Sequence, residues 1–310
     1  MIDPTTHLAI ADSFLQPMGP VAADQLRHLK IVTLLTMIAV VPVMVATPWI
    51  LWRYRRSKPT GEYRPNWDSN PILERLMWGV PILVVCLMGV SLWKMTFRLD
   101  PYKEMGKDPL KIQVIGLDWK WVFIYPDEGV ALVDELVVPE GRAVELTLTT
   151  DTVMQSLQIS AIVGQIYAMP AMTTKLNFIA ARQGEAQGMN TQFTGNGFWK
   201  QKFSVYSVSK EEYAARMKKA QSSDLSLTAD TYAILAMQGT SEEAKKPLAI
   251  EGRTGPIEMV LGDKKIFQRV LARYMVEDMT PESQPGSPSY DPKKSPLPPA
   301  SDKPMMGMEM

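Results

Sequence analysis

Two long apolar runs lie in the first third of the chain. Residues 31–52 contain no charged side chain, and a helix of this length covers roughly 33 Å, close to a hydrocarbon core of about 30 Å. Residues 76–93 form a second uncharged run. Tryptophans lie at one end of the first run and frame the second, as is typical at membrane interfaces. The pattern predicts a transmembrane hairpin over 28–98, with spans at about 31–52 and 73–94.

The loop expected between the spans, residues 53–72, is rich in arginine and lysine, whereas the 30 residues before the first span carry only Arg27 and Lys30. Short basic loops remain in the cytoplasm. Basic residues also follow the second span, but a long domain crosses the membrane largely regardless of its charge. Both termini are therefore expected outside the cytoplasm, with 1–27 as an extracytoplasmic segment.

From residue 109 to 208 the apolar positions alternate with a period of two. In one segment Trp119, Trp121, Phe123 and Tyr125 occupy every second position, and Val144, Leu146 and Leu148 do so in another. Turn sequences rich in Gly, Pro and Asn separate these segments. Short strands at this spacing are typical of a sandwich or barrel, so an all-β sandwich is expected.

The composition changes twice after the alternating region. Ser209 and Glu212 have the spacing of a capping box, which predicts a helix to about residue 221. Shorter helices are expected near 228–238 and 263–276, so 209–279 is predicted to be a short helical extension. Proline, serine and lysine then dominate 280–310. Such a segment cannot bury a core, and a disordered tail is expected.

The amino-acid composition argues against nucleic-acid binding and against metal sites built from thiols or imidazoles in the alternating region. Its 33 basic and 33 acidic side chains balance, so it lacks the basic surplus of a nucleic-acid-binding protein. Its only cysteine, Cys86, lies within the second apolar run, and its two histidines, His7 and His28, precede the first. The alternating region therefore contains neither thiol nor imidazole, and no metal site based on those groups can form there.

Several segments together resemble a known family. The motifs are Gly116–Trp121 (GLDWKW), Tyr63–Trp67 (YRPNW), Gln165–Met169 (QIYAM) and Phe193–Phe198 (FTGNGF). Following two apolar spans, they resemble subunit II of the haem–copper respiratory oxidases over roughly residues 20–275, and are most similar to the cytochrome bo-type ubiquinol oxidases. The resemblance implies that the sandwich is cupredoxin-like.

In the cytochrome c-oxidising branch of that family, this domain holds two copper ions through two Cys, two His, a Met and a carbonyl. By the resemblance, the copper positions fall on residues of the wrong chemistry here: Met154, Asn190, Gln192, Thr194, Phe198 and Gln201. Copper sites of this kind need thiolate and imidazole ligands. The chain is therefore expected to bind no metal, and no catalytic residue is expected in it.

Glu74 and the two tryptophans of the motif have two interpretations each. Glu74 begins the second span; the family places a glutamate there beside a proton pathway, but a carboxylate at a helix start is also stabilised by the helix dipole. Trp119 and Trp121 form either a docking surface or one aromatic face of a core strand, and the missing copper ligands favour the core. Asp151, with the neighbouring Thr152 and Gln155, is interpreted as loop polarity.

The resemblance implies subunit II of a ubiquinol oxidase complex that reduces O2 to water and translocates protons. Haem and copper would lie in catalytic subunit I, with subunits III and IV as further partners, in a bacterial inner membrane. This chain would support the catalytic subunit without a cofactor of its own. Two alternatives remain: a copper electron relay of a cytochrome c oxidase, and a membrane-tethered binding module outside respiration.

Overall fold

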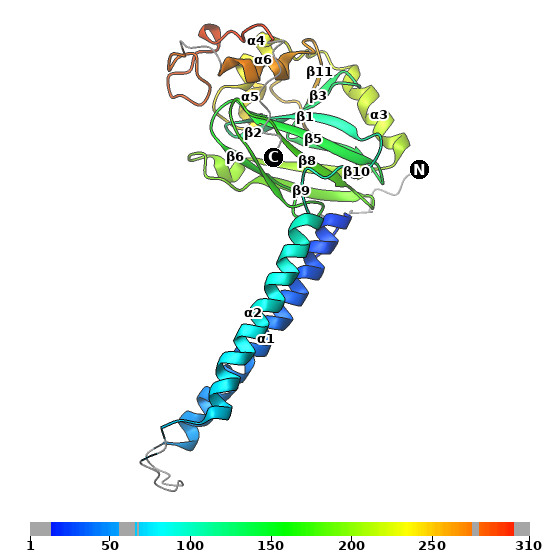
Figure 1. The fold of residues 1–310 in the computed structure, drawn as a ribbon. Coiled ribbons are helices and arrows are strands. Elements are labelled where there is room, and N and C mark those ends of the chain that lie inside the picture. Colours follow the sequence, from blue (N-terminus) through cyan, green and yellow to red (C-terminus); the bar gives the residue numbers. More distant parts are fainter. Residues whose placement is uncertain (1–13, 56–65, 67, 275–278, 301–310) are drawn as a thin grey trace. The chain divides into compact units, whose positions relative to one another are not determined.

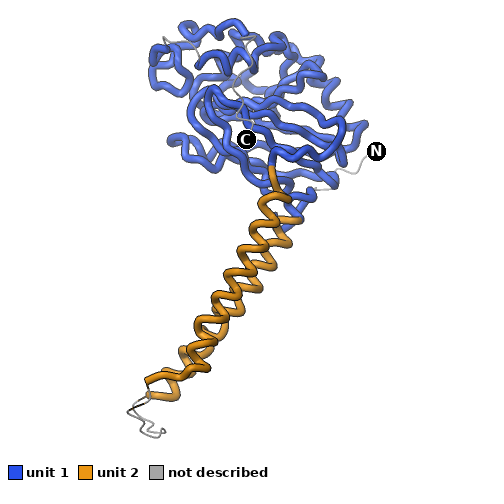
Figure 2. Tube along the Cα trace, in the orientation of Figure 1, with its two compact units in different colours: residues 1–23, 101–310 blue, residues 24–100 orange. Residues whose placement is uncertain are grey.

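The computed structural model describes residues 14–55, 66, 68–274 and 279–300 (Figure 1). The chain divides into two compact units, Asp24–Asp100 and the combination of Met1–Ala23 with Pro101–Met310 (Figure 2). The expected boundaries at 208 and 279 do not coincide with a division between these units. The sequence-based domain boundaries stay a prediction, and each unit is described by itself below.

Two long helices form the smaller unit. Helix α1 covers Pro20–Arg53 and helix α2 covers Pro71–Arg98, and both are long and apolar enough to cross a membrane. Each extends past its uncharged run. Asn70 caps α2 by accepting hydrogen bonds from the backbone N–H groups of Ile72 and Leu73. The helices confirm the expected hairpin, although most of its loop, with Arg56, Lys58 and the motif 63–65, lies outside the described residues.

Two β-sheets form the larger unit, which confirms the expected sandwich. The six-stranded sheet has the order β11-β3-β2-β1-β5-β8, and the five-stranded sheet has the order β4-β10-β9-β6-β7. In the first sheet the bounds are β1 Leu110–Leu117, β2 Lys120–Tyr125, β3 Val130–Val133, β5 Ala143–Thr150, β8 Thr174–Ile179 and β11 Ile257–Val260. In the second they are β4 Glu135–Pro139, β6 Gln155–Gln158, β7 Gln165–Ala168, β9 Gly184–Asn190 and β10 Lys202–Val208.

Strand β2 is buried on both faces. Trp121, Phe123 and Tyr125 belong to the core between the two sheets. Val122 and Ile124 point the other way, into a second core that the C-terminal segments complete. The alternating apolar pattern indicates only the first of these cores, because the residues that cover the second face come from much later in the chain.

The C-terminal extension is helical but also contributes a strand. Its helices are α3 Lys210–Gln221, α4 Ala229–Leu235, α5 Ser241–Lys245 and α6 Ile266–Arg273, so the three helices expected from the sequence are present. Strand β11 was not predicted; it pairs antiparallel with β3, with Ile257 opposite Val133. Four residues give too short an alternation to be distinguished from a loop.

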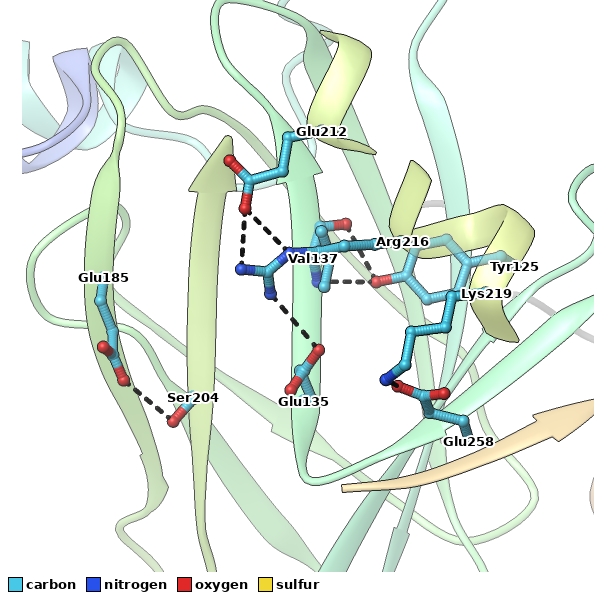
Figure 3. A network of polar contacts seen from close by, with 9 residues as sticks. All are labelled: Tyr125, Glu135, Val137, Glu185, Ser204, Glu212, Arg216, Lys219 and Glu258. Carbon is cyan, nitrogen blue, oxygen red and sulfur yellow. Dashed lines mark hydrogen bonds and ion pairs between the residues drawn. The ribbon is translucent and has the colours of Figure 1, made fainter. Parts of the chain in front are cut away.

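Helix α3 is tied to both sheets by a network of charges (Figure 3). Arg216 forms ion pairs with Glu212 on its own helix and with Glu135 on β4, and its guanidinium stacks 4.5 Å from the centre of the Tyr206 ring. Lys219 of α3 pairs with Glu258 on β11 at 2.7 Å. These contacts hold the extension against the sandwich, so it is part of the same compact unit.

The proline-rich segment differs from the expected disordered tail. Between residues 279 and 300 the chain packs against the second core: Leu297 is buried, and Tyr290 donates a hydrogen bond to the carbonyl of Ala233. Arg269 of α6 also donates to the carbonyls of Leu297 and Pro298. Prolines lose little conformational entropy on ordering, which makes such a segment easier to hold than its composition indicates. Residues 301–310 lie outside the described residues.

Candidate functional site

The residues at the expected copper positions lie at one end of the sandwich, and the structure brings only three of them into contact. Asn190 ends β9, Thr194 lies in the loop that follows, and Gln201 lies between a short 3-10 helix and β10; all three are buried. Met154 is exposed, and Gln192 and Phe198 are half-buried. The side chains of these last three do not take part in the buried contacts described below.

A hydrogen-bonded amide network fills the place where metal ligands were expected. Asn190 Nδ2 donates to Gln201 Oε1 at 3.0 Å and approaches Thr194 Oγ1 at 3.4 Å. Gln201 Nε2 donates to Gln155 Oε1 at 2.7 Å, and Gln155 Nε2 donates to the carbonyl of Leu117 at 3.1 Å. The network therefore connects β9, β6 and β1 with the residue that precedes β10.

The remaining polar atom of Asn190 is also occupied. Its Oδ1 accepts the backbone N–H groups of Ser156 and Gln192, each at 3.0 Å. A buried polar group without a partner would cost about 1–3 kcal/mol, and here the amide groups satisfy one another. We call Gln155, Asn190, Thr194 and Gln201 the amide cluster.

These donors do not fit copper. Cu sites in such domains use soft thiolate and imidazole ligands, whereas the amide cluster offers hard amide oxygens that already accept hydrogen bonds, and N–H groups that point inward. Within the described ranges, no group of three or more His, Cys, Asp or Glu side chains is placed to hold a metal ion.

The two tryptophans of the motif have different environments. Trp121 lies within β2 and is completely buried, with its ring edge-to-face against Phe203 at 6.2 Å, so it cannot form a docking surface. Trp119 precedes the strand and is half-buried; its Nε1 donates to the carbonyl of Thr194 at 3.0 Å. Its ring lies so close to Gly197 that an added Cβ there would come within 2.0 Å of a ring atom. The core interpretation is correct for Trp121, and Trp119 braces the loop beside the amide cluster.

Exposed apolar side chains surround this end of the sandwich. Val153 and Met154 lie on the loop before β6, and Phe193 and Trp199 lie on the segment between β9 and β10. All four are exposed. We call them the loop-end apolar residues. Large apolar side chains gathered on loops are typical of contact surfaces between proteins.

Asp151, interpreted from the sequence as loop polarity, is instead completely buried. Its Oδ1 lies 3.0 Å from Nε of Arg273, an ion-pair contact that is not aligned as a hydrogen bond, and its Oδ2 accepts the hydroxyl of Tyr232 at 2.7 Å. Burial raises the pKa of Asp151 to about 6, although Arg273 and the hydrogen bond from Tyr232 lower it. Because Arg273 and Tyr232 lie 81 or more positions away in the chain, only the tertiary structure reveals this pair.

Two further charges lie in this region: Lys120, within the tryptophan motif, and Asp134, which is half-buried. Lys120 is buried, and its Nζ donates to the carbonyls of Asp118 at 3.1 Å and Met237 at 2.8 Å. Burial lowers the pKa of Lys120 to about 8, while Asp134 and Asp118 raise it. Burial raises the pKa of Asp134 to about 6, despite the hydrogen bond that its side chain accepts from the backbone N–H of Trp121. These groups connect the motif to the extension.

Glu74 lies in the first turn of α2 and is exposed. Its backbone N–H donates to the carbonyl of the capping residue Asn70 at 3.0 Å. This is the position where a carboxylate is stabilised by the positive end of the helix dipole. The placement agrees with both interpretations of Glu74, so its role in proton transfer stays a prediction.

Comparison with known proteins identifies relatives over most of the chain. No protein-family model matches it. It is 36% identical to ubiquinol oxidase subunit 2 of Acetobacter aceti, over 72% of this chain and 74% of that protein. It is 34% identical to cytochrome bo(3) ubiquinol oxidase subunit 2 of Pseudomonas putida, over 84% of this chain and 80% of that protein. Among solved structures, the periplasmic domain of subunit II of cytochrome oxidase of Bradyrhizobium japonicum is 22% identical over 37% of this chain and 94% of that chain, with a TM-score of 0.36.

Proposed function

The chain belongs to the family of ubiquinol oxidase subunit 2, and from this membership we propose how it serves the complex. The complex oxidises ubiquinol, reduces O2 to water and translocates protons across the membrane. Haem and copper reside in the catalytic subunit I. The present chain is the second subunit, anchored by α1 and α2, and it contributes no redox group.

The amide cluster is the observation that supports this role most directly. In a copper relay the same positions would supply thiolates and imidazoles. Here Asn190, Gln201 and Gln155 bond to one another, and Asn190 Nδ2 lies 3.0 Å from Gln201 Oε1. The hydrogen bonds hold the loops that a metal would otherwise hold. Electrons therefore pass from the quinol directly to the catalytic subunit, and the cytochrome c relay is the weaker alternative.

The domain's task is then to bind and stabilise its partners. The loop-end apolar residues, together with Trp119, form the surface that contacts the catalytic subunit. Trp121 has no part in that contact because it is completely buried. Subunits III and IV complete the complex, and the binding module outside respiration is disfavoured by the family membership.

Membrane placement follows from the distribution of charge. The complex lies in the inner membrane of a bacterium, with the loop between α1 and α2 in the cytoplasm and both termini on the periplasmic side. Basic short loops are retained on the cytoplasmic side, and Arg53 and Arg55 lie directly at this loop.

Glu74 is the candidate for proton entry. It lies at the cytoplasmic start of α2 in this placement, where an exposed carboxylate can collect protons from water. An ionisable side chain at such a boundary can pass protons to a channel mouth of the catalytic subunit. In this role Glu74 moves protons and no electrons.

Purification of the whole complex in mild detergent tests the proposal. Haem bands in the visible spectrum, together with ubiquinol-dependent oxygen uptake, are expected. Copper is expected in the amount that the catalytic subunit accounts for, and it should not change when the chain carries Gln201→Leu. Two additional copper ions per complex would establish the relay instead. Isolation of the chain without any haem protein would favour the non-respiratory binding module.

A further inference from the structure

Two contacts fix how α1 and α2 align at the end of the hairpin opposite the connecting loop. Asp24 of α1 accepts hydrogen bonds from Nε and Nη2 of Arg98 of α2 at 2.7 and 3.0 Å. One turn further along α1, Nδ1 of His28 lies 3.2 Å from the hydroxyl of Ser91. Both contacts lie in the seam between the antiparallel helices. They therefore fix which residues of α1 and α2 lie at the same depth along the helix axes, and toward which side of the hairpin the neighbouring side chains point.

Arg27 and Lys94 lie at the same depth in this register. Arg27 comes three residues after Asp24 and Lys94 comes four before Arg98, which places them about 4.5 and 6 Å from the ion pair along the helix axes. Steps of three and four residues return a side chain to nearly the same face. Arg27 and Lys94 therefore flank the seam between the two contacts.

The two cations also lie on the same side of the hairpin. The three-residue step from Asp24 to Arg27 falls about 60° short of a full helical turn. The four-residue step backwards from Arg98 to Lys94 goes about 40° beyond one. Because the helices are antiparallel and face each other, these two rotations turn Arg27 and Lys94 toward one common side. Lys30, a further three residues along α1, continues that side. We call Arg27, Lys30 and Lys94 the basic seam.

The charges of the basic seam are not neutralised by carboxylates of the described chain. All three side chains are exposed, and none of the ion pairs found among the described residues includes them. Asp24, the acidic neighbour on α1, is already bound by two nitrogens of Arg98, Nε and Nη2. Three cations on one side of a two-helix seam are complementary to an anionic group.

The basic seam lies where a membrane has its headgroups. The first uncharged run begins at Ile31, directly after Lys30, and the second ends at Trp93, directly before Lys94. Trp93 and Phe97 add an exposed aromatic pair at this level, with ring centres 5.2 Å apart. Aromatic rings of this kind mark the membrane interface, and Lys and Arg side chains at the level of the headgroups attract anionic lipids.

We propose that the basic seam binds the phosphate of an anionic glycerophospholipid at this end of the hairpin. Arg27 and Lys94 hold the phosphate from the two helices, and Lys30 adds a third charge. The bound lipid offsets the repulsion between cations that the two helices bring together. The proposal rests on the membrane anchoring in the proposed function, and the leaflet is the periplasmic one if the proposed orientation holds.

The test uses the whole complex in mild detergent. Phosphatidylglycerol or phosphatidylcholine is added in increasing amounts, and the lipid retained per complex is measured by native mass spectrometry. The unmodified complex should retain phosphatidylglycerol in preference to phosphatidylcholine. R27Q/K94Q should weaken that retention roughly tenfold or more, since it removes two of the three charges that attract the phosphate. R27K/K94R should preserve it.

The matched control is K103Q/K107Q, which removes two exposed cations that follow α2 but lie outside the seam. It should retain phosphatidylglycerol like the unmodified complex. Equal retention of both lipids by the unmodified complex, or equal losses in the seam and control variants, would overturn the inference. Displacement of the lipid by millimolar inorganic phosphate would also overturn it, in favour of a site for the free ion.

Haem content and ubiquinol-dependent oxygen uptake are measured in the same samples. A complex that contains haem, is active and shows no lipid preference contradicts only the lipid site. Absence of haem contradicts the proposed function. If R27Q/K94Q fails to assemble, the lipid preference of the unmodified complex and of R27K/K94R decides the question.

Discussion

Replacing Arg273 by methionine tests whether the C-terminal extension stabilises the loop that begins at Asp151. Both partners of the ion pair are nearly inaccessible, with side-chain exposures of 5% for Arg273 and 0% for Asp151. Methionine fills much of the same volume but leaves the carboxylate without its counter-charge. Removing one partner of a buried pair typically costs about 3–5 kcal/mol, because the remaining charge stays desolvated.

The cost should depend on pH in a defined direction. In the native chain the pKa of Asp151 is raised by burial to about 6, above the reference value of 3.8. The folded state therefore holds this proton more tightly than the unfolded state, and the destabilising contribution of the ionised carboxylate falls as the pH decreases through about 6. Loss of Arg273 removes a favourable charge and raises the pKa of Asp151 further. The penalty of Arg273→Met should thus be largest above neutral pH and clearly smaller at pH 5.

Hydrogen exchange of the intact chain in detergent measures the effect where it arises. The backbone N–H of Asp151 donates to the carbonyl of Gly116 at 3.1 Å, so peptides covering 149–158 report on opening of this loop. Exchange at pH 5 and pH 8, corrected for intrinsic rates, gives the local free energy of opening. Asp151→Asn combined with Arg273→Met should recover most of the loss, because no charge is then left unpaired.

Arg253→Met is the matched control. Arg253 pairs with Asp224 at 3.0 Å, but the two side chains are 53% and 82% exposed, and exposed pairs contribute about 0–1 kcal/mol. If Arg273→Met costs no more than Arg253→Met and shows no dependence on pH, the buried pair does not stabilise the loop and the reasoning is refuted.

Three further predictions concern the site and the proton path. Gln201→Leu leaves amide groups of Asn190 and its neighbours without partners, so the chain should lose about 2–4 kcal/mol, seen as a lower midpoint of thermal unfolding; an unchanged midpoint would contradict the network. Gly197→Ala places a methyl group against the Trp119 ring, which should cost about 1–3 kcal/mol and shift tryptophan emission; unchanged emission would show that the ring is not held there. Glu74→Gln should slow ubiquinol-dependent oxygen uptake by at least about tenfold if the carboxylate delivers protons, with Glu74→Asp retaining most activity, whereas equal rates would favour the helix-dipole role.

The order of elements follows from the sequence because its causes are local. A bilayer requires about 20 consecutive apolar residues, and both spans carry that signal within a single segment. The alternation in a strand such as β5 reflects burial of one face by the opposite sheet, and that pattern is also visible residue by residue. The absence of cysteine and histidine from the sandwich is a matter of composition and needs no coordinates.

The contents of the site depended on the tertiary structure. Gln155 and Gln201 are 46 positions apart, and the backbone N–H of Ser156 donates to Asn190 across 34. Polar side chains at strand ends and in loops have the same sequence signature whether they face water or one another, so the sequence does not distinguish the amide cluster from surface polarity. For the same reason the interpretation of Asp151 as loop polarity is wrong, since its burial is not visible in the sequence. The second core, strand β11 and the packed proline-rich segment also required the fold, because each is stabilised by contacts with distant parts of the chain and not by its own periodicity.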